Sequence, residues 1–358
     1  MAGPWSCAIL LETFSGPSNV SESGPITFNM QEQQLQELRR ERWHLNGHAV
    51  RTLDDARRFI DSVGFCLLYP QRPAVLAPTF VGAFVGGEEK LPTWQTAFAD
   101  PRASEAKHLM VRLLRDKAAY EANVFGENNF LVSASVFPYF YGLVGDRNPK
   151  QAPKATTRSG YSTLAVDTFQ LVNKHGPIPK HRLREMLGKE ITEAALDRAL
   201  DELWAKLRIT RVDYNQDAGV FWDVLFRWAP EAVKEGMHVS VAESLTALVS
   251  KYLDGVLAAQ QEEIENFFSP VIGRARVREA VNALQAAREL SFVHVGGRVL
   301  MQISSLQATH LAPIPQERTK APSPMPASPP RRGMPLVERS KRTRAAKNAK
   351  PSRRDEGQ

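Results

Sequence analysis

The chain has 358 residues, of which 43% are hydrophobic and 24% are charged, so it is long enough for two or three domains with real cores. Its two cysteines, Cys7 and Cys66, exclude a disulfide framework and a cysteine-rich zinc site, and they favour a reducing compartment. The apolar runs are too short to span a membrane, and no basic segment precedes the short AILL run near the N-terminus. We therefore expect a cytoplasmic protein.

The formal net charge of +7 comes from the C-terminal end of the chain. From Leu306 onward there are 12 Lys and Arg against 4 Asp and Glu, a net charge of +8 that leaves −1 for everything before it. This segment, 306–358, also contains nine prolines and is predicted to be a flexible basic tail. Such a tail either raises the affinity for nucleic acid through counterion release or only keeps the chain in solution.

The N-terminal part begins with an unpatterned stretch. Residues 1–29 mix Ser, Gly, Pro and Asn and are predicted to be a disordered leader, so translation starts at either Met1 or Met30. A strongly charged helix is expected directly after it, in QEQQLQELRRERWHL. The next helix is expected to begin at Thr52, with Asp55 as its capping partner, and to end at Gly64.

Short apolar segments follow this helix. GFCLLYP predicts a strand that Pro70 stops, a further strand is expected in TFVGAFVGG, and residues 104–121 predict a long amphipathic helix. The segment NFLVSASVFPYFYGLVG is expected to be a buried helix or strand, with a base-stacking platform as the alternative. Together these elements predict an N-terminal helical or winged-helix-like domain over 30–145, and the polar residues 146–160 predict a linker.

Beyond the linker, three helices followed by a β-hairpin occur twice. In 161–236 the helices YSTLAVDTFQLVNKHG, PIPKHRLREMLG and TEAALDRALDELWAKL precede the hairpin ITRVDY, NQDAG, VFWDVL. In 237–305 a helix opened by Ser240 and Glu243, then EEIENFF and RARVREAVNALQAAREL, precede SFVHV, Gly296-Gly297 and RVLMQI. This order is typical of the winged helix. The predicted fold is mainly α with small β-hairpins (α+β), with tandem winged-helix domains.

The third helix of the second unit has the better surface for DNA. Residues at spacings of three and four lie opposite its apolar stripe, and their types read base edges or hold phosphates. They are Arg274, Arg278, Asn282 and Gln285, with Arg276 close by, and Arg298 on the hairpin completes the candidate surface. The alternative is that these are solvated helix residues.

The third helix of the first unit is acidic on its outward side. Four carboxylates there would repel phosphates: Glu193, Asp197, Asp201 and Glu202. The neighbouring short helix instead offers four basic residues that could hold a phosphate backbone: Lys180, His181, Arg182 and Arg184. The expected partner is therefore double-stranded DNA.

No motif points to a cofactor or a metal. The sequence has no HExxH, no Walker loop and no dinucleotide glycine fingerprint, and its eight histidines form no ligand pattern. Cys66 lies in an apolar strand and is expected to be a core residue rather than a nucleophile. We predict no cofactor and no metal site.

The run from Gln31 to Gln302 resembles the AlkZ-like (YcaQ-like) winged-helix family, which contains bacterial DNA glycosylases. The segments that carry the resemblance are GFCLLYP, NFLVSASVFPYFYGL, KHGPIPKHRLREMLG, ALDRALDELWAKLRITRV, WDVLFRWAPEAV and ARVREAVNALQAARELSFVHVGGR. The resemblance implies tandem winged helices that form a concave DNA-binding surface, and it implies no cofactor.

Active glycosylases of that family look similar at a G-x-x-Q-x-D/Q-P element, where a glutamine and a second polar residue orient the hydrolytic water. Gly64 and Pro70 match the two ends of the element. Leu67 stands at the glutamine position and Tyr69 at the second polar position. Leucine cannot bind a water through a hydrogen bond, and tyrosine is a poor base at neutral pH.

Three hypotheses on function therefore stay open, and with them the question whether the chain is an enzyme. The first is a DNA-binding protein on the nucleoid that recognises duplex shape or a lesion without base excision. The second is a monofunctional DNA glycosylase for alkylated or crosslinked bases, whose relocated catalytic group would come from Tyr69, Gln71 or Arg72. The third is a protein-interaction scaffold, which the acidic helix at 193–202 favours.

Overall fold

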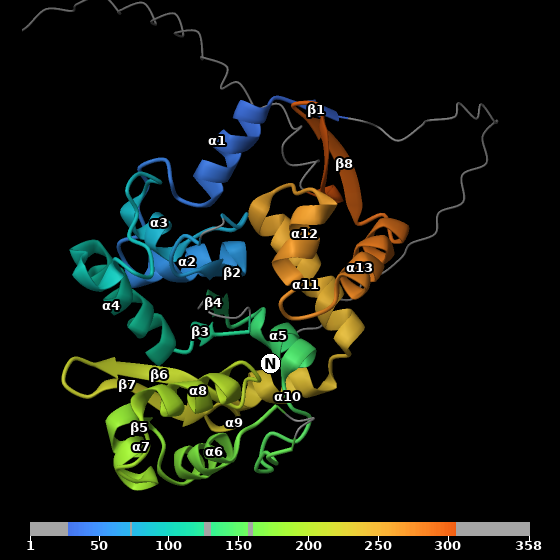
Figure 1. Cartoon of the computed structure of the whole chain (residues 1–358). Helices are drawn as coiled ribbons and strands as arrows, with labels where there is room; N and C mark the ends of the chain where they lie inside the picture. Colours follow the sequence, from blue (N-terminus) through green and yellow to red (C-terminus); the bar gives the residue numbers. More distant parts are fainter. Residues whose placement is uncertain (1–27, 72–73, 125–129, 157–159, 306–358) are drawn as a thin grey trace, which may run out of the picture. The chain divides into compact units, whose positions relative to one another are not determined.

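The computed structural model describes residues 28–71, 74–124, 130–156 and 160–305 (Figure 1). The predicted tail and residues 1–27 of the predicted leader lie outside these ranges. The leader prediction is wrong at its end, because Phe28–Met30 form strand β1, which pairs in parallel with Leu290–Val295 (β8). The predicted α+β fold, mainly helical with small β-hairpins, is confirmed. No helix among the described residues is long and apolar enough to cross a membrane.

The N-terminal part contains helices around a small sheet of strand order β2-β4-β3. Its elements are α1 (Glu32–Arg42), α2 (Leu53–Val63), β2 (Phe65–Leu67), α3 (Phe80–Val85), the 3-10 helix η1 (Ala97–Ala99), α4 (Pro101–Arg115), β3 (Ala119–Ala122), β4 (Phe130–Ser133) and α5 (Phe137–Val144). Helix α2 begins and ends as predicted: Thr52 and Asp55 form a capping box, and Gly64 is the C-cap with φ of 79°.

Two element predictions in this part are wrong. The expected strand in TFVGAFVGG is helix α3, because the Thr79 side chain accepts a hydrogen bond from the Gly82 N–H and Gly86 ends the helix in a left-handed conformation. The expected helix over 104–121 ends at Arg115, since Lys117 has a positive φ of 55° and turns the chain into β3.

The middle part follows the predicted order closely. Its elements are α6 (Thr163–His175), β5 (Ile178–Pro179), α7 (Lys180–Leu187), α8 (Glu193–Trp204), β6 (Ile209–Asn215) and β7 (Gly219–Val224), in a sheet of order β5-β7-β6. Two further helices, α9 (Leu225–Trp228) and α10 (Pro230–His238), lead into the last part. Neither of these was separately predicted from the sequence.

The last part has α11 (Val241–Val256), α12 (Gln261–Phe268), α13 (Arg274–Ala286), β8 (Leu290–Val295) and β9 (Arg298–Ile303). Its sheet has the order β1-β8-β9. Ala259, between α11 and α12, also bridges to Met301 of β9. At the start of α11, Ser240 accepts a hydrogen bond from the Glu243 N–H, which is one half of the predicted capping box.

One order of elements therefore occurs three times: helix, strand or bridge, helix, helix, strand, strand. The three runs start at α2, α6 and α11, and in the first two the sheet has the same internal order. Helices α4, α8 and α13 occupy the same place in these runs, directly before a hairpin. The sequence predicted this order for the two later runs and only a looser helical unit for the first.

The first and third runs share a hydrophobic core. Tyr252 of α11, which is 2% exposed, stacks against Phe65 of β2 and Phe267 of α12, with ring centroids 6.5 and 4.6 Å apart. The Tyr252 hydroxyl donates to the carbonyl of Leu76. In contrast, the middle run packs its own cluster around Trp204. The first and third runs are thus joined through buried aromatic side chains.

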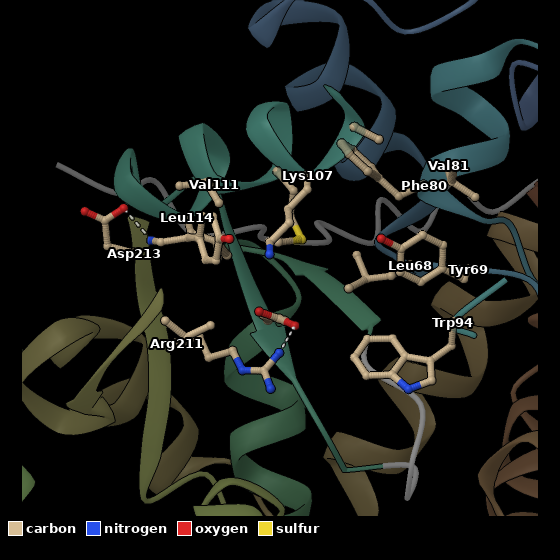
Figure 2. A pocket seen from close by; sticks show the side chains of 15 residues that line it. Leu68, Tyr69, Phe80, Val81, Trp94, Lys107, Val111, Leu114, Arg211 and Asp213 are labelled. Atoms are coloured by element: carbon tan, nitrogen blue, oxygen red, sulfur yellow. Dashed lines mark hydrogen bonds and ion pairs between the residues drawn. The ribbon is translucent and has the colours of Figure 1, made fainter. Parts of the chain in front are cut away.

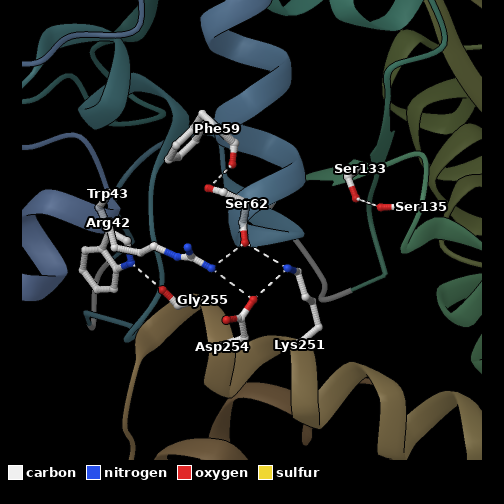
Figure 3. Close-up of polar contacts among 9 residues, drawn as sticks. All are labelled: Arg42, Trp43, Phe59, Ser62, Ser133, Ser135, Lys251, Asp254 and Gly255. Atoms are coloured by element: carbon white, nitrogen blue, oxygen red, sulfur yellow. Dashed lines mark hydrogen bonds and ion pairs between the residues drawn. The ribbon is translucent and has the colours of Figure 1, made fainter. Parts of the chain in front are cut away.

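A polar network makes a second link between the same parts (Figure 3). The carbonyl oxygen of Ser62, at the end of α2, accepts hydrogen bonds from Arg42 and from Lys251 of α11, and both cations also contact Asp254. Cations suit the negative end of a helix. A Cβ at Gly64 would lie 2.5 Å from the Lys251 side chain, so both φ and this contact require glycine there.

The segment predicted as a linker is anchored along residues 146–151. The Arg208 side chain is 1% exposed and donates to the Asp146 carboxylate at 2.6 Å, to the Asn148 carbonyl and to the Gln151 carbonyl. Arg147 donates to backbone carbonyls at the end of α10. The sequence did not show that this segment is anchored, because its polar residues gave no apolar pattern. The segment is held by hydrogen bonds from Arg147 and Arg208 instead of by apolar packing.

Candidate nucleic-acid interface and the adjacent cavity

The element GFCLLYP places its residues in different surroundings. Leu67 is 4% exposed and packs in the core that β2 shares with α11. Cys66 is 1% exposed, and burial raises the pKa of its thiol, so it is a core residue as expected. Tyr69 lies beyond the end of β2 and lines a cavity. Gln71 is described but does not line that cavity, and Arg72 lies outside the described residues.

The cavity has a volume of about 230 Å³ and lies between α3, α4 and the hairpin of the middle part (Figure 2). Tyr69, Phe80 and Trp94 line one end, where the rings of Tyr69 and Trp94 have centroids 6.2 Å apart. Lys107 of α4 and Arg211 of β6 supply positive charge further along. A largely apolar and aromatic lining with a few polar groups is typical of sites for planar organic groups.

Most charges in the cavity are already paired. Glu121 is 2% exposed and binds Arg211 at 3.0 Å, and Asp213 binds Arg115 at 2.6 Å. The Arg211 guanidinium also lies 4.1 Å from the centre of the Trp204 ring. These pairs join β3 and α4 to β6, so we assign them to the structure of the cavity wall.

Burial shifts the pKa of two further side chains that line the cavity, Tyr69 and Lys107. Burial, with smaller contributions from Glu121 and Asp100, raises the pKa of Tyr69. Its hydroxyl therefore stays protonated at neutral pH and can donate a hydrogen bond but cannot act as a base. Burial also lowers the pKa of Lys107, whose Nζ lies 3.5 Å from the centre of the Tyr214 ring.

The predicted polar face of α13 is exposed. Arg274, Arg276, Arg278 and Asn282 are exposed, and Gln285 is partly buried, with its amide 3.7 Å from the Met301 sulfur. Arg278 makes a two-point contact with the buried Glu265 carboxylate at 2.7 and 3.0 Å, and this contact lowers the pKa of Glu265. Arg274 donates to the Asn266 side chain at 2.8 Å.

These contacts hold two of the guanidinium groups in fixed positions beside α12. Arg276 has neither a hydrogen bond nor an ion pair from its side chain within the described part of the chain. On the hairpin, Arg298 binds Glu32 of α1 at 2.6 Å, which leaves its charge largely neutralised. Arg276 is therefore the least constrained cation of this surface.

The N-terminus of α13, like that of α7, has no side-chain cap and no acidic residue in its first turn. Its N-cap is Gly273, without a side-chain hydrogen bond, and its first turn carries arginines and no acidic residue. Helices α2, α8, α11 and α12 all have an acidic residue in the first turn. Arginines at the positive end of a helix dipole are unfavourable for the isolated helix and favourable for a bound anion.

The second predicted cation group, on α7, is largely neutralised. Lys180 binds Glu193 at 3.0 Å and Asp197 at 2.6 Å, Arg184 also binds Glu193, and Arg182 binds Glu185 of its own helix. His181 is exposed. Two of the four α8 carboxylates that were expected to repel DNA, Glu193 and Asp197, therefore serve as partners of Lys180 and Arg184 on α7.

Of the residues that line the cavity, only Tyr69 was predicted from the sequence as a site candidate. Trp94, Lys107, Glu121 and Arg211 come from a loop, a helix and two strands that only the tertiary fold brings together. One signal was present: Glu121 and Arg211 each interrupt an apolar strand with a charge, and buried charges of opposite sign are usually paired.

Comparisons with known proteins give a family and a solved structure with a similar fold. The family model described as AlkZ related matches residues 50–269, more than half of the chain. Among solved structures, the Streptomyces sahachiroi DNA glycosylase AlkZ is similar with a TM-score of 0.55 and 13% sequence identity, over 80% of this chain and 74% of that one. At this identity the likeness concerns the fold. No curated protein matches the chain in a sequence search.

Proposed function

Because the chain belongs to the AlkZ-related family, we propose that it binds duplex DNA and recognises damaged duplex without excising the base. On this proposal the three runs of elements are winged helices, occupying about 30–145, 161–236 and 237–305. The protein would act on the DNA of a bacterial cytoplasm. The similar solved structure is a DNA glycosylase by its title, which supports DNA as the partner.

The observation that carries the proposal is the surface of α13. This helix stands directly before a hairpin, in the place of the helix that enters the major groove in a helix-turn-helix protein. It presents Arg274, Arg276 and Arg278 on its exposed side together with Asn282. The neutral Asn266 side chain of α12 holds Arg274, so little conformational entropy is lost when Arg274 binds phosphate or base edges. Arg278 is bound to the Glu265 carboxylate, which leaves Arg274 and Arg276 as the cations of this helix without an ion pair among the described residues.

The geometry of GFCLLYP argues against the family's hydrolysis. Leu67 packs in the core and offers no hydrogen bond to a water. Tyr69 reaches the cavity, but its raised pKa keeps it protonated. The remaining carboxylates at the cavity are bound to arginines, so they are weak candidates for activating a water.

The proposal is tested by titrating the full chain with a duplex, in undamaged and alkylated form, at several salt concentrations. We expect salt-sensitive binding, with a preference for the alkylated duplex and no release of free base. If a chain ending at Ser305 shows no salt-sensitive duplex binding, the proposal fails and the scaffold hypothesis replaces it.

A DNA glycosylase is the second candidate, and the cavity beside Tyr69 favours it. An aromatic lining with a half-buried lysine could hold a damaged base. An assay of base release from alkylated and crosslinked duplex separates the two functions. Release that is lost in Tyr69→Phe or Gln71→Ala would establish the glycosylase and overturn binding without excision.

A further inference from the structure

Two aromatic side chains project from the loop between α3 and α4. Phe98 is 97% exposed and Trp94 is 61% exposed, the highest values among the large hydrophobic residues exposed in the described part of the chain. They lie four residues apart, on either side of the start of η1. Exposing such large apolar surface to water is unfavourable, so a partner that covers both rings is expected.

Hydrogen bonds hold the backbone of this loop in a tight turn. The Thr93 N–H donates to the Thr96 hydroxyl at 2.9 Å, and the Ala97 N–H donates to the Thr93 carbonyl at 2.8 Å. At the end of the loop, Arg102 donates to the Lys90 carbonyl at 2.7 Å and binds Asp100. A tight turn with both ends fixed presents its aromatic side chains without a large entropic cost on binding.

The surroundings of the loop favour nucleic acid over protein as the partner. The loop leads directly into α4, the helix that takes the place of α13 in the first run. The exposed side of α4 carries Ser104, Glu105, His108, Arg112 and Arg115. Arg115 already binds Asp213, which leaves Arg112 as an exposed arginine without an ion pair in the described part of the chain. An exposed arginine on this helix suits a phosphate, and residues just before the helix N-terminus would then face the groove.

The Trp94 ring also lines the cavity that contains Tyr69 and Lys107. The loop therefore contributes one ring, Phe98, to the surface and another, Trp94, to the wall of the cavity. Aromatic side chains at such a place can stack on bases or wedge between them, and wedging is cheapest where the bases are already unpaired.

We infer that Trp94 and Phe98 form an aromatic wedge that inserts at an unpaired or poorly stacked step of duplex DNA. The inference rests on the proposed function and adds to it a substrate class: duplexes with a locally opened base step. The wedge, rather than a lesion-specific hydrogen bond, would then supply the preference for damaged DNA.

The test compares two duplexes of one sequence, one fully paired and one with a single unpaired base, by fluorescence anisotropy with the full chain. We expect tighter binding to the second duplex by at least about fivefold, the effect of one base–aromatic stack. Phe98→Ser and Trp94→Ser should each remove most of this preference, and Phe98→Leu should keep part of it, because leucine also serves as a wedge.

Val241→Ser is the matched control, since Val241 is 36% exposed on α11 and away from the loop. It should leave the preference unchanged. A preference that survives both serine variants would overturn the wedge while the proposed function stands, and absence of binding to either duplex would overturn both. A change of oligomeric state in Phe98→Ser, measured by sedimentation, would assign the surface to a protein partner and overturn the inference.

Discussion

Leu67 stands where the resemblance places a catalytic glutamine, and its surroundings decide what this position can do. It lies on β2, 4% exposed, in the core shared with α11, whereas Tyr69 two residues later reaches the cavity. The same short element therefore contributes a core residue and a cavity residue. The position of Leu67 in this fold is structural.

Replacing Leu67 with glutamine tests this role. The variant places an amide in the core without a partner, so we expect the free energy of unfolding to fall by about 2–3 kcal/mol. Urea denaturation measures it, with Leu67→Met as the volume-conserving control, which should cost less than about 1.5 kcal/mol. A Leu67→Gln chain as stable as the wild type would mean that the side chain reaches a polar space.

Cys66 gives a second prediction at the same scale. Burial raises the pKa of its thiol, and because thiolates are the reactive form, we expect slow modification in the folded chain. In a Cys7→Ser background, a disulfide reagent at neutral pH should react with Cys66 at least about 100-fold more slowly than in urea. Equal rates in both conditions would contradict the burial of this residue.

Among the elements, α7 and α13 both carry several basic residues, but the two helices differ in how many of these residues are in ion pairs. The ion pairs to α8 neutralise Lys180 and Arg184, whereas Arg276 stays exposed. We expect Arg276→Ala to weaken duplex binding about fivefold and to reduce the salt slope by about one, as for a lost phosphate contact.

Arg184→Ala is the matched comparison on α7. Because Glu193 already binds Arg184 at 3.2 Å, its removal should change the affinity for duplex by less than about twofold. Both variants are measured by the same anisotropy titration. A larger loss in Arg184→Ala than in Arg276→Ala would place the DNA on α7 instead of α13.

The anchored segment at 146–151 supports a further prediction. Asp146→Asn leaves Arg208, 1% exposed, without its carboxylate partner. Because Asp146 is 38% exposed and Arg208 keeps two carbonyl partners, the loss is that of one charged hydrogen bond, about 1.5 kcal/mol, which urea denaturation should detect as a lower midpoint. Asp217→Asn, in the exposed turn of the β6–β7 hairpin, is the control and should unfold like the wild type.

Much of the element order could be predicted from the sequence, because caps and apolar spacing are local signals. Thr52 with Asp55, Gly64 and the Gly296-Gly297 turn were all placed correctly. The cavity could not be predicted, since Trp94 and Arg211 meet only through tertiary packing. The charge on α7 was also misjudged, because the sequence does not show that α8 supplies its carboxylates.

In the folded region as a whole, the first and third runs of elements share one aromatic core around Tyr252, and the network at Ser62 joins them again. The sequence predicted separate domains over 30–145 and 237–305, and these contacts tie helix α11 of the second to α2 and β2 of the first. The first and third runs, which carry α4 and α13 respectively, are therefore packed together by residues far apart in the sequence.

The basic tail complicates any measurement of DNA binding, because its net charge of +8 can bind phosphates by itself. The most direct test of the central claim is therefore the salt dependence of duplex binding by a chain that ends at Ser305, with and without Arg276→Ala. We predict binding that weakens with salt, and a slope smaller by about one in the variant. Absence of duplex binding without the tail, or a slope that Arg276→Ala leaves unchanged, would contradict the assignment of α13 as the DNA-binding surface.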